Sequence, residues 1–412
     1  METAPLKAKD RQFVLSEESP FSFDELFFTR TGESGIILSG NSVFQRVSVY
    51  SWDELLQKPH SHVRHPDMPR AVFWLLWETI KKGEPIGAYV KNRAKDGRYY
   101  WVFAVITPID GGYLSVRLKP SSPLFEAVQE EYSQLRAREN KENLKPEQSA
   151  EILLERIQAH GFPDYVSFMT TALSQEITAR DKAANRKEDY LITYFEHLLM
   201  SSQNLLKHAT IVSEVYEKNK NVPLNLRVQA AHLGAVGAPM NVISENYTAI
   251  SANIEADMGG FIESSNTVEK TVKEGLLLTC ISRLQRETID LFKDEEDHEG
   301  ATRDIEMKYL EQQQHFYTDK ASEGLETISQ QVKKFERACA EMGKLTTNLE
   351  ITRVMGRIEG SSVDTSMTNV NDLIEELGAF QEAVLKGLKD IQHTNQDIRF
   401  DVEQLLKASS KL

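Results

Sequence analysis

The sequence is poor in cysteine, in basic charge and in long apolar runs, and each shortage excludes a class of protein. Two cysteines in 412 residues, Cys280 and Cys339, favour reduced thiols in a cytoplasmic protein over the disulfide framework of a secreted domain. The formal net charge of -14 disfavours nucleic acid as a partner, because nucleic acid is a polyanion. No apolar run approaches the ~18 residues of a membrane span, and the N-terminus lacks the apolar core of a signal peptide. We therefore expect no membrane insertion.

The chain divides into two halves of different composition. The first carries all 4 tryptophans and several strand-like runs, and Asp96-Gly97 is typical of a hairpin turn. The order of strand, short helices, hairpin and last strand predicts a small antiparallel sheet with helices, an α+β domain. The second half has few prolines and is predicted to be helical. The predicted segments are a flexible N-terminus at 1–19, the sheet domain at 20–122, a connector helix at 123–150, a helical hairpin at 151–297 and a second hairpin at 298–412.

Apolar residues recur at heptad spacing in the second half, which predicts long packed helices in an all-α coiled-coil bundle. A faint internal repeat accompanies the heptads, because NLRVQAAHLGAVG from Asn225 has a counterpart in NLEITRVMGRIEG from Asn348. If the repeat is genuine, two hairpins in tandem would form one intramolecular four-helix bundle. The heptad positions are Tyr247, Ile254, Phe261 and Val268, and later Leu377, Val384, Ile391, Ile398 and Leu405.

The segment HVRHPDMPRA, from His62 to Ala71, is dense in charge and contains two prolines just before the apolar run AVFWLLW. Two interpretations are open. The rigid turn either lines a ligand pocket or simply shapes the entry into a buried helix. In the second case Asp67 would serve as a helix cap.

The stretch FFTRTGESGIILSGNSVFQRVSVYSWDELLQKPHSHVRHPDMP, with VKNRAKDGRYYWV further on, resembles a PAS domain, and more narrowly that of the flavin-binding aerotaxis receptors. The resemblance implies a five-stranded antiparallel sheet with short helices around one pocket. It also implies FAD as the cofactor, held by Asn41, Arg64, His65 and Asp67. An arginine for phosphate and polar groups for the ring edges suit such a ligand.

Other ligands remain open for this domain. Haem is an alternative to flavin, with His60, His62 or His65 as an axial ligand, and an empty domain used for dimerisation is a third possibility. His60 and His62 are otherwise expected at the surface. The chain also departs from the aerotaxis pattern after GEP, where Ile86 stands in place of a tryptophan.

The segment VPLNLRVQAAHLGAVGAPMNVISENYTAISANI resembles a degenerate signalling tip of the methyl-accepting chemotaxis proteins, at 222–245. The resemblance implies a hairpin tip that binds the coupling protein CheW and the histidine kinase CheA or other receptors. Carried over, the partner-binding positions are Asn225, Gln229, His232 and Gly237. Gln229 and His232 replace a glutamate and an arginine of the family pattern. TALSQEITAR fits a methylation segment loosely around Gln175 and Glu176, and two solvated helix residues are the alternative.

These observations lead to one main functional hypothesis and one alternative. The main hypothesis is a cytoplasmic sensory protein of the aerotaxis type, which senses redox state, oxygen or a small ligand and relays it to chemotaxis proteins. The alternative is a non-signalling scaffold or array-modulating protein with an empty PAS domain. A homodimer fits either. We expect no enzyme, because the sequence has no phosphate-binding loop, no transmitter histidine motif, no metal-ligand spacing and no nucleophile elbow.

Overall fold

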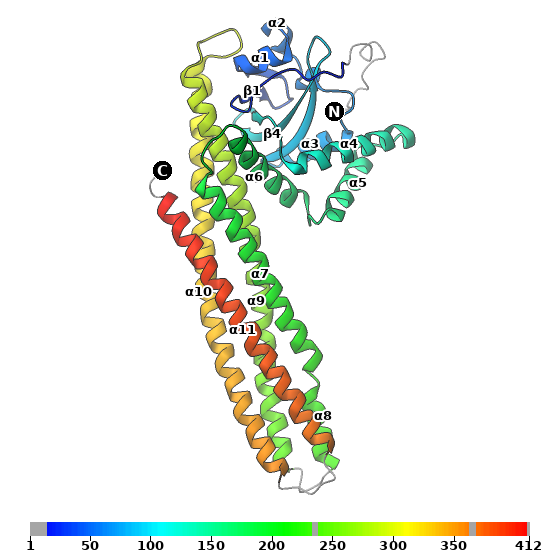
Figure 1. The fold of residues 1–412 in the computed structure, drawn as a ribbon, viewed down its shortest axis with the longest axis vertical. Coiled ribbons are helices and arrows are strands. Elements are labelled where there is room, and N and C mark those ends of the chain that lie inside the picture. The colour runs from blue at the N-terminus through cyan, green and yellow to red at the C-terminus, as the bar shows by residue number, and fades with distance from the viewer. Residues whose placement is uncertain (1–14, 233–237, 362–367, 410–412) are drawn as a thin grey trace. The chain divides into compact units, whose positions relative to one another are not determined.

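The structure is a computed structural model that describes residues 15–232, 238–361 and 368–409 (Figure 1). The chain divides into two compact units. The first comprises Met1–Ile192 and Leu276–Ala321, and the second comprises Thr193–Gly275 and Ser322–Leu412. Two long helices, α9 (Ala238–Lys293) and α10 (Arg303–Ser361), contribute residues to both units.

Five strands in the described residues form one sheet in the first unit, in the order β2-β1-β5-β4-β3, and every neighbouring pair is antiparallel. The predicted fold class of this half is confirmed. The predicted hairpin at Asp96-Gly97 joins β3 to β4, and Gly97 has a φ of 93°, which glycine adopts without steric cost. The strands are β1 (Phe27–Gly32), β2 (Ile37–Gly40), β3 (Ile86–Arg93), β4 (Tyr99–Ile109) and β5 (Gly112–Leu118).

Four short helices lie between β2 and β3 in the chain. The side chain of Asn41 caps the first by accepting from the Phe44 amide. The fourth is capped from outside, because the carboxylate of Glu139 accepts from the amides of Arg70 at 2.7 Å and Ala71 at 3.3 Å. A cap by Asp67, one of the two sequence interpretations, is therefore wrong. The helices are α1 (Ser42–Ser48), α2 (Trp52–Leu55), the 3-10 helix η2 (His60–Val63) and α3 (Arg70–Ile80).

The chain leaves the sheet through three helices rather than through one connector. The single helix predicted over 123–150 is two helices in the structure. The first ends because Asn143 adopts the left-handed conformation, with φ of 49° and ψ of 46°, and Pro146 then starts the next. These helices are α4 (Pro123–Glu142), α5 (Pro146–Ala159) and α6 (Tyr165–Ala183).

A buried carboxylate joins strand β3, the start of α4 and helix α6. Glu176 of α6 is fully buried, and its Oε1 accepts from the hydroxyl of Tyr89 at 2.8 Å and from that of Ser122 at 2.5 Å. Its Oε2 accepts from the Ser121 amide at 2.6 Å. Glu176 is therefore a structural group, and its burial contradicts the alternative interpretation, which made it a solvated helix residue.

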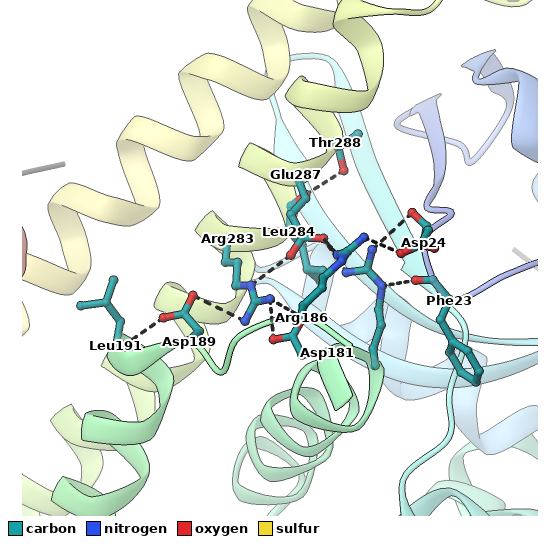
Figure 2. Close-up of polar contacts among 11 residues, drawn as sticks. Phe23, Asp24, Asp181, Arg186, Asp189, Leu191, Arg283, Leu284, Glu287 and Thr288 are labelled. Carbon is teal, nitrogen blue, oxygen red and sulfur yellow. Dashed lines mark hydrogen bonds and ion pairs between the residues drawn. The ribbon is translucent and has the colours of Figure 1, made fainter. Parts of the chain in front are cut away.

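Ion pairs fasten the C-terminal end of α6 to helix α9 within the first unit (Figure 2). Arg283 of α9 donates to both carboxylate oxygens of Asp181 at 2.6 Å. The guanidinium of Arg180 is fully buried and donates to Glu287 of α9 at 2.5 Å and to the Phe23 carbonyl at 2.6 Å. The cluster thus ties together a loop before β1, helix α6 and helix α9.

The second unit is built from long helices packed side by side (Figure 1). The predicted heptad residues form its core, since each of the nine is at most 2% exposed. The two predicted hairpins, 151–297 and 298–412, pack against each other within one chain. The ring centroids of Phe261 in α9 and Phe335 in α10, for example, are 5.3 Å apart. No helix among the described residues has the length and apolar character needed to cross a membrane. The remaining helices are α7 (Tyr190–Asn219), α8 (Val222–His232) and α11 (Thr368–Ser409).

Candidate functional site

The predicted RHPD turn, residues 64–67, is fastened to strand β3. Arg64 pairs through its backbone with Asn92, and the His65 amide donates to the Lys91 carbonyl at 3.2 Å. The Lys91 ammonium in turn donates to the Asp67 carboxylate at 2.8 Å. Arg64, His65 and Asp67 thus all lie in this turn, and the Asp67 side chain is 65% exposed.

His65 carries a buried hydrogen-bond donor without an acceptor. The ring is fully buried, and burial and the nearby Lys91 charge lower the pKa of His65 to about 4, so the imidazole is neutral near pH 7. Its Nδ1 accepts from the Asp67 amide at 3.2 Å, which places the single ring proton on Nε2. In the described part of the chain nothing accepts from that Nε2–H.

Arg64 has no carboxylate partner within the part of the chain that the structure describes. Its guanidinium lies over the ring of Phe73, 3.4 Å from the centroid, and its buried Nε has no hydrogen-bond partner among the described residues. Burial, followed by the charge of Arg136, lowers the pKa of Arg64 to about 10. A cation that stacks on an aromatic ring keeps its N–H groups available for an acceptor.

Asn41 lies apart from this turn and serves the backbone. Its Oδ1 accepts from the amides of Phe28 at 3.0 Å and Phe44 at 3.2 Å, and its Nδ2 donates to the Leu26 carbonyl at 2.8 Å. The side chain thus fixes the position of α1 against β1. Any effect of Asn41 on a ligand would act through that position.

A second buried arginine, Arg117 of β5, was not predicted. It is 6% exposed, its Nη1 donates to the Thr29 hydroxyl at 2.9 Å, and its Nη2 donates to Nε2 of His60 at 2.8 Å. No carboxylate in the described residues pairs with it, and burial lowers the pKa of Arg117 to about 10. We refer to Thr29, His60, Tyr100 and Arg117 as the interior cluster.

His60 is half-buried and belongs to this cluster. Its ring stacks on Phe44, with centroids 5.9 Å apart and planes 16° apart. Burial and the charges of Arg117 and Arg64 hold the pKa of His60 well below its usual value, so the neutral ring accepts from Arg117 through Nε2. His60 is thus half-buried, with its ring held by Arg117, whereas His62 is exposed.

Two unpartnered hydroxyls lie on the same sheet face as Arg117. Ala104 pairs with Arg117 in the β4–β5 register, so Tyr100 on β4 and Ser115 on β5 share the face of Arg117 by their even spacing. Their buried hydroxyls have no partner among the described residues. A guanidinium, two hydroxyls and apolar neighbours fit a planar ligand with carbonyl or anionic edges, and the FAD ring system has such edges.

The same histidines do not fit haem. An axial histidine needs a bare Nε2 and usually donates its Nδ1–H to a neighbouring acceptor. The Nε2 lone pair of His60 already accepts from Arg117, Nε2 of His65 carries the proton, and His62 is exposed.

The cluster left only a weak signal in the sequence. YLSVRLKP alternates polar and apolar residues. An arginine on the inward face of such a strand is the one feature that could have indicated a buried site. His60 gave no signal, because its neighbours in the chain are polar. The position of the family's tryptophan, Ile86, lies on β3 and is 1% exposed, so an aliphatic side chain takes that place in the core.

The predicted partner-binding positions lie on or next to α8 in the second unit. Asn225 and His232 are exposed, Gln229 is half-buried, and Gly237 lies outside the described residues. Leu224 of the same helix is 57% exposed. The exposed side chains leave this helix open to a partner, and the partner stays a prediction.

Comparison with known proteins supports the fold of the sheet domain. A family profile for the PAS fold matches residues 37–116. The aerotaxis receptor of Escherichia coli (strain K12) is 39% identical over 130 residues, which is 30% of this chain and 26% of that protein. This chain thus spans about a quarter of the length of that relative.

Two solved structures also align with the chain. One is the light-state structure of the blue-light photoreceptor Aureochrome1 LOV, at 20% identity and a TM-score of 0.22, covering 29% of this chain and 92% of that one. The other is a fungal LOV domain photoreceptor, at 17% identity and a TM-score of 0.20, covering 27% and 83%. The family profile, together with the observed sheet order, shows that residues 37–116 form a domain with the PAS fold.

Proposed function

We propose that this chain is a cytoplasmic sensory protein of the aerotaxis type, in which the PAS domain binds FAD and the helices relay its state to chemotaxis proteins. Similarity to an aerotaxis receptor supports the taxis role. The observation that carries the proposal is the buried guanidinium of Arg117, whose described partners are a hydroxyl and a neutral imidazole. A buried cation without a counter-charge is costly, and an anionic or carbonyl-rich ligand edge would offset that cost.

The chain's own groups suggest how the ligand would be held. Arg117, Tyr100 and Ser115 would donate to one edge of the ring system from the sheet, and the Nε2–H of His65 is a further donor. Arg64 would serve the phosphates, as a guanidinium suits them. FAD would supply a redox couple, and the protein groups around it would set its potential.

The relay would begin where the sheet meets the following helices. The carboxylate of Glu176 in α6 connects Tyr89 of β3 to the start of α4 through hydrogen bonds. A shift of the strand would therefore move both α4 and α6. CheW and CheA are the proposed partners at α8, where Asn225 and His232 are exposed. A homodimer is compatible with this arrangement.

A scaffold or array-modulating role with an empty PAS domain is the second candidate. The observation in its favour is the replacement of charged tip residues of the chemotaxis pattern by Gln229 and His232. A capture experiment with purified CheW separates the two roles. Saturable binding that is lost in Asn225→Asp supports the relay, and no binding at high protein concentration supports the scaffold.

The cofactor proposal is tested by the visible spectrum of the purified full-length protein, before and after reduction, and by titration with FAD. We expect the two visible bands of oxidised flavin, bleached by reduction, or quenching of FAD fluorescence on titration. His65→Gln should weaken binding, whereas His62→Gln, at an exposed position in the same segment, should not. A colourless protein that leaves FAD fluorescence unchanged contradicts the proposal.

A further inference from the structure

The turn between α9 and α10, residues 294–302, lies against the PAS domain. The amide of Gly40, at the end of β2, donates to the Gly300 carbonyl at 3.0 Å. The amide of Ser42, at the start of α1, donates to the Glu295 carboxylate at 2.5 Å. Two backbone donors of the PAS domain are thus satisfied by a segment more than 250 positions away in the chain.

Close packing adds to these hydrogen bonds. The ring of His298 stacks on Trp52 of α2, with centroids 4.9 Å apart and planes 9° apart. Gly300 approaches the same indole so closely that a Cβ there would lie 2.4 Å from ring atoms of Trp52. Such a contact is far inside van der Waals distance, so only glycine fits this position while the turn is docked.

The helices on either side of the turn are anchored to strand β1. The ring of Phe292 in α9 packs edge-on against the ring of Phe28, with centroids 5.0 Å apart. Arg30 donates to both carboxylate oxygens of Glu306 of α10, at 2.7 and 2.9 Å, and Glu306 is almost fully buried. The turn and the two adjoining helix ends therefore form one continuous contact with the PAS domain.

Contacts connect this surface to the interior cluster. Arg117 bonds to His60, His60 stacks on Phe44, and Phe44 lies in α1. The side chain of Asn41 fixes α1 to β1, and its two neighbours in the chain, Gly40 and Ser42, are the residues that bond to the turn. A ligand that moves His60 would therefore move α1 and the two donors that hold the turn.

We infer that the α9–α10 turn is an output contact of the PAS domain, docked in one state of α1 and released in another. The inference adds a second route to the one through α4. It acts directly on α9 and α10, which both continue into the helical unit. The step from ligand to α1 rests on the proposed function, whereas the step from α1 to the turn does not. By linkage, a ligand that favours one state must bind more weakly when the turn is held in the other.

The test is amide hydrogen exchange of the full-length protein without added ligand, read at residues 40–48 and 294–302. In Gly300→Ala the added methyl group should displace the turn. We then expect at least tenfold faster exchange of the Gly40 and Ser42 amides and of the α1 amides behind them. Glu299→Ala, an exposed neighbour in the same turn, is the matched control and should leave both segments unchanged.

Glu295→Ala is the second variant, because it removes the acceptor of Ser42 without adding bulk. If both variants leave exchange at residues 40–48 unchanged, the docking is overturned. If the turn alone exchanges faster and α1 does not respond, the coupling is overturned.

FAD titration of the wild type and Gly300→Ala then tests the ligand step. A change in affinity of threefold or more supports the coupling, and equal affinities overturn that step. A wild type that binds no FAD counts against the flavin proposal alone, since the exchange data decide the docking independently.

Discussion

Nη2 of Arg117 lies 2.8 Å from Nε2 of His60, so a buried cation has a neutral base as a partner. The imidazole satisfies the N–H group and leaves the charge uncompensated. Native interiors tolerate such a charge mainly at functional positions, because desolvation is expensive without a counter-ion. This pair is the reason to place a ligand edge beside β5.

Arg117→Gln should separate ligand binding from stability. We expect FAD affinity to fall about tenfold or more, equivalent to ~1.4 kcal/mol, because a charged donor is lost. Without ligand, the free energy of unfolding should stay level or rise, because an uncompensated buried charge is removed. Fluorescence titration and urea unfolding measure the two quantities, and Arg98→Gln on the β3–β4 turn is the control. Unchanged affinity in Arg117→Gln would refute the role of this residue.

His65 should make the protein less stable in mild acid. Its pKa is lowered from 6.5 to about 4 in the folded state, so between these values the unfolded chain binds a proton that the folded chain does not. Stability contributed by neutral His65 is therefore present above pH 6.5 and falls as pH drops, by about 1.4 kcal/mol per unit, until the folded group titrates near 4. We therefore expect the free energy of unfolding, measured with urea at several pH values in this range, to fall less steeply with decreasing pH in His65→Gln than in the wild type. An identical slope in the variant would contradict this, and exposed His62→Gln is the control.

Glu176→Gln should weaken the joint between the PAS sheet and helices α4 and α6. The amide keeps one acceptor oxygen and places an NH₂ group against donors, so at least one of the Tyr89, Ser121 and Ser122 groups loses its partner. We expect a loss of about 1–3 kcal/mol in unfolding free energy. Gln175→Ala, at the exposed neighbouring position, should stay within about 0.5 kcal/mol of wild type. Equal stabilities for the two variants would show that the buried carboxylate is not needed.

Arg180→Ala should be more destabilising than Arg186→Ala, although both arginines pair with Glu287. Arg180 is fully buried and also donates to the Phe23 carbonyl, so its loss removes buried packing and leaves that carbonyl without this donor, at a cost of about 1–3 kcal/mol. The Arg186 side chain is 35% exposed, and its pairs should contribute about 0–1 kcal/mol. Thermal and urea unfolding of both variants gives the comparison, and similar losses would contradict the assignment.

Elements that depend on a local pattern could be predicted from the amino-acid sequence. Alternating strands and the Asp96-Gly97 turn predicted the sheet and its hairpin, and heptads ending in Leu405 predicted the helical core, because side-chain periodicity decides which face is buried. The turn around residues 64–69 was also located from local sequence, because Pro66 and Pro69 restrict the backbone there. Its cofactor role rests on resemblance and stays a prediction.

Contacts between residues far apart in the chain could not be predicted in this way and required the folded structure. The pairing of Arg117 with His60 spans strands and helices that no periodicity relates. The cap that Glu139 provides for α3 and the docking of Gly300 against Trp52 are likewise contacts between remote segments. Such contacts arise from the packing of separately formed elements. Each depends on a single side chain or, at Gly300, on the absence of a side chain. A sequence pattern gives no information about which distant residue a side chain will contact. The contact between the α9–α10 turn and the PAS domain could therefore be found only in the folded protein.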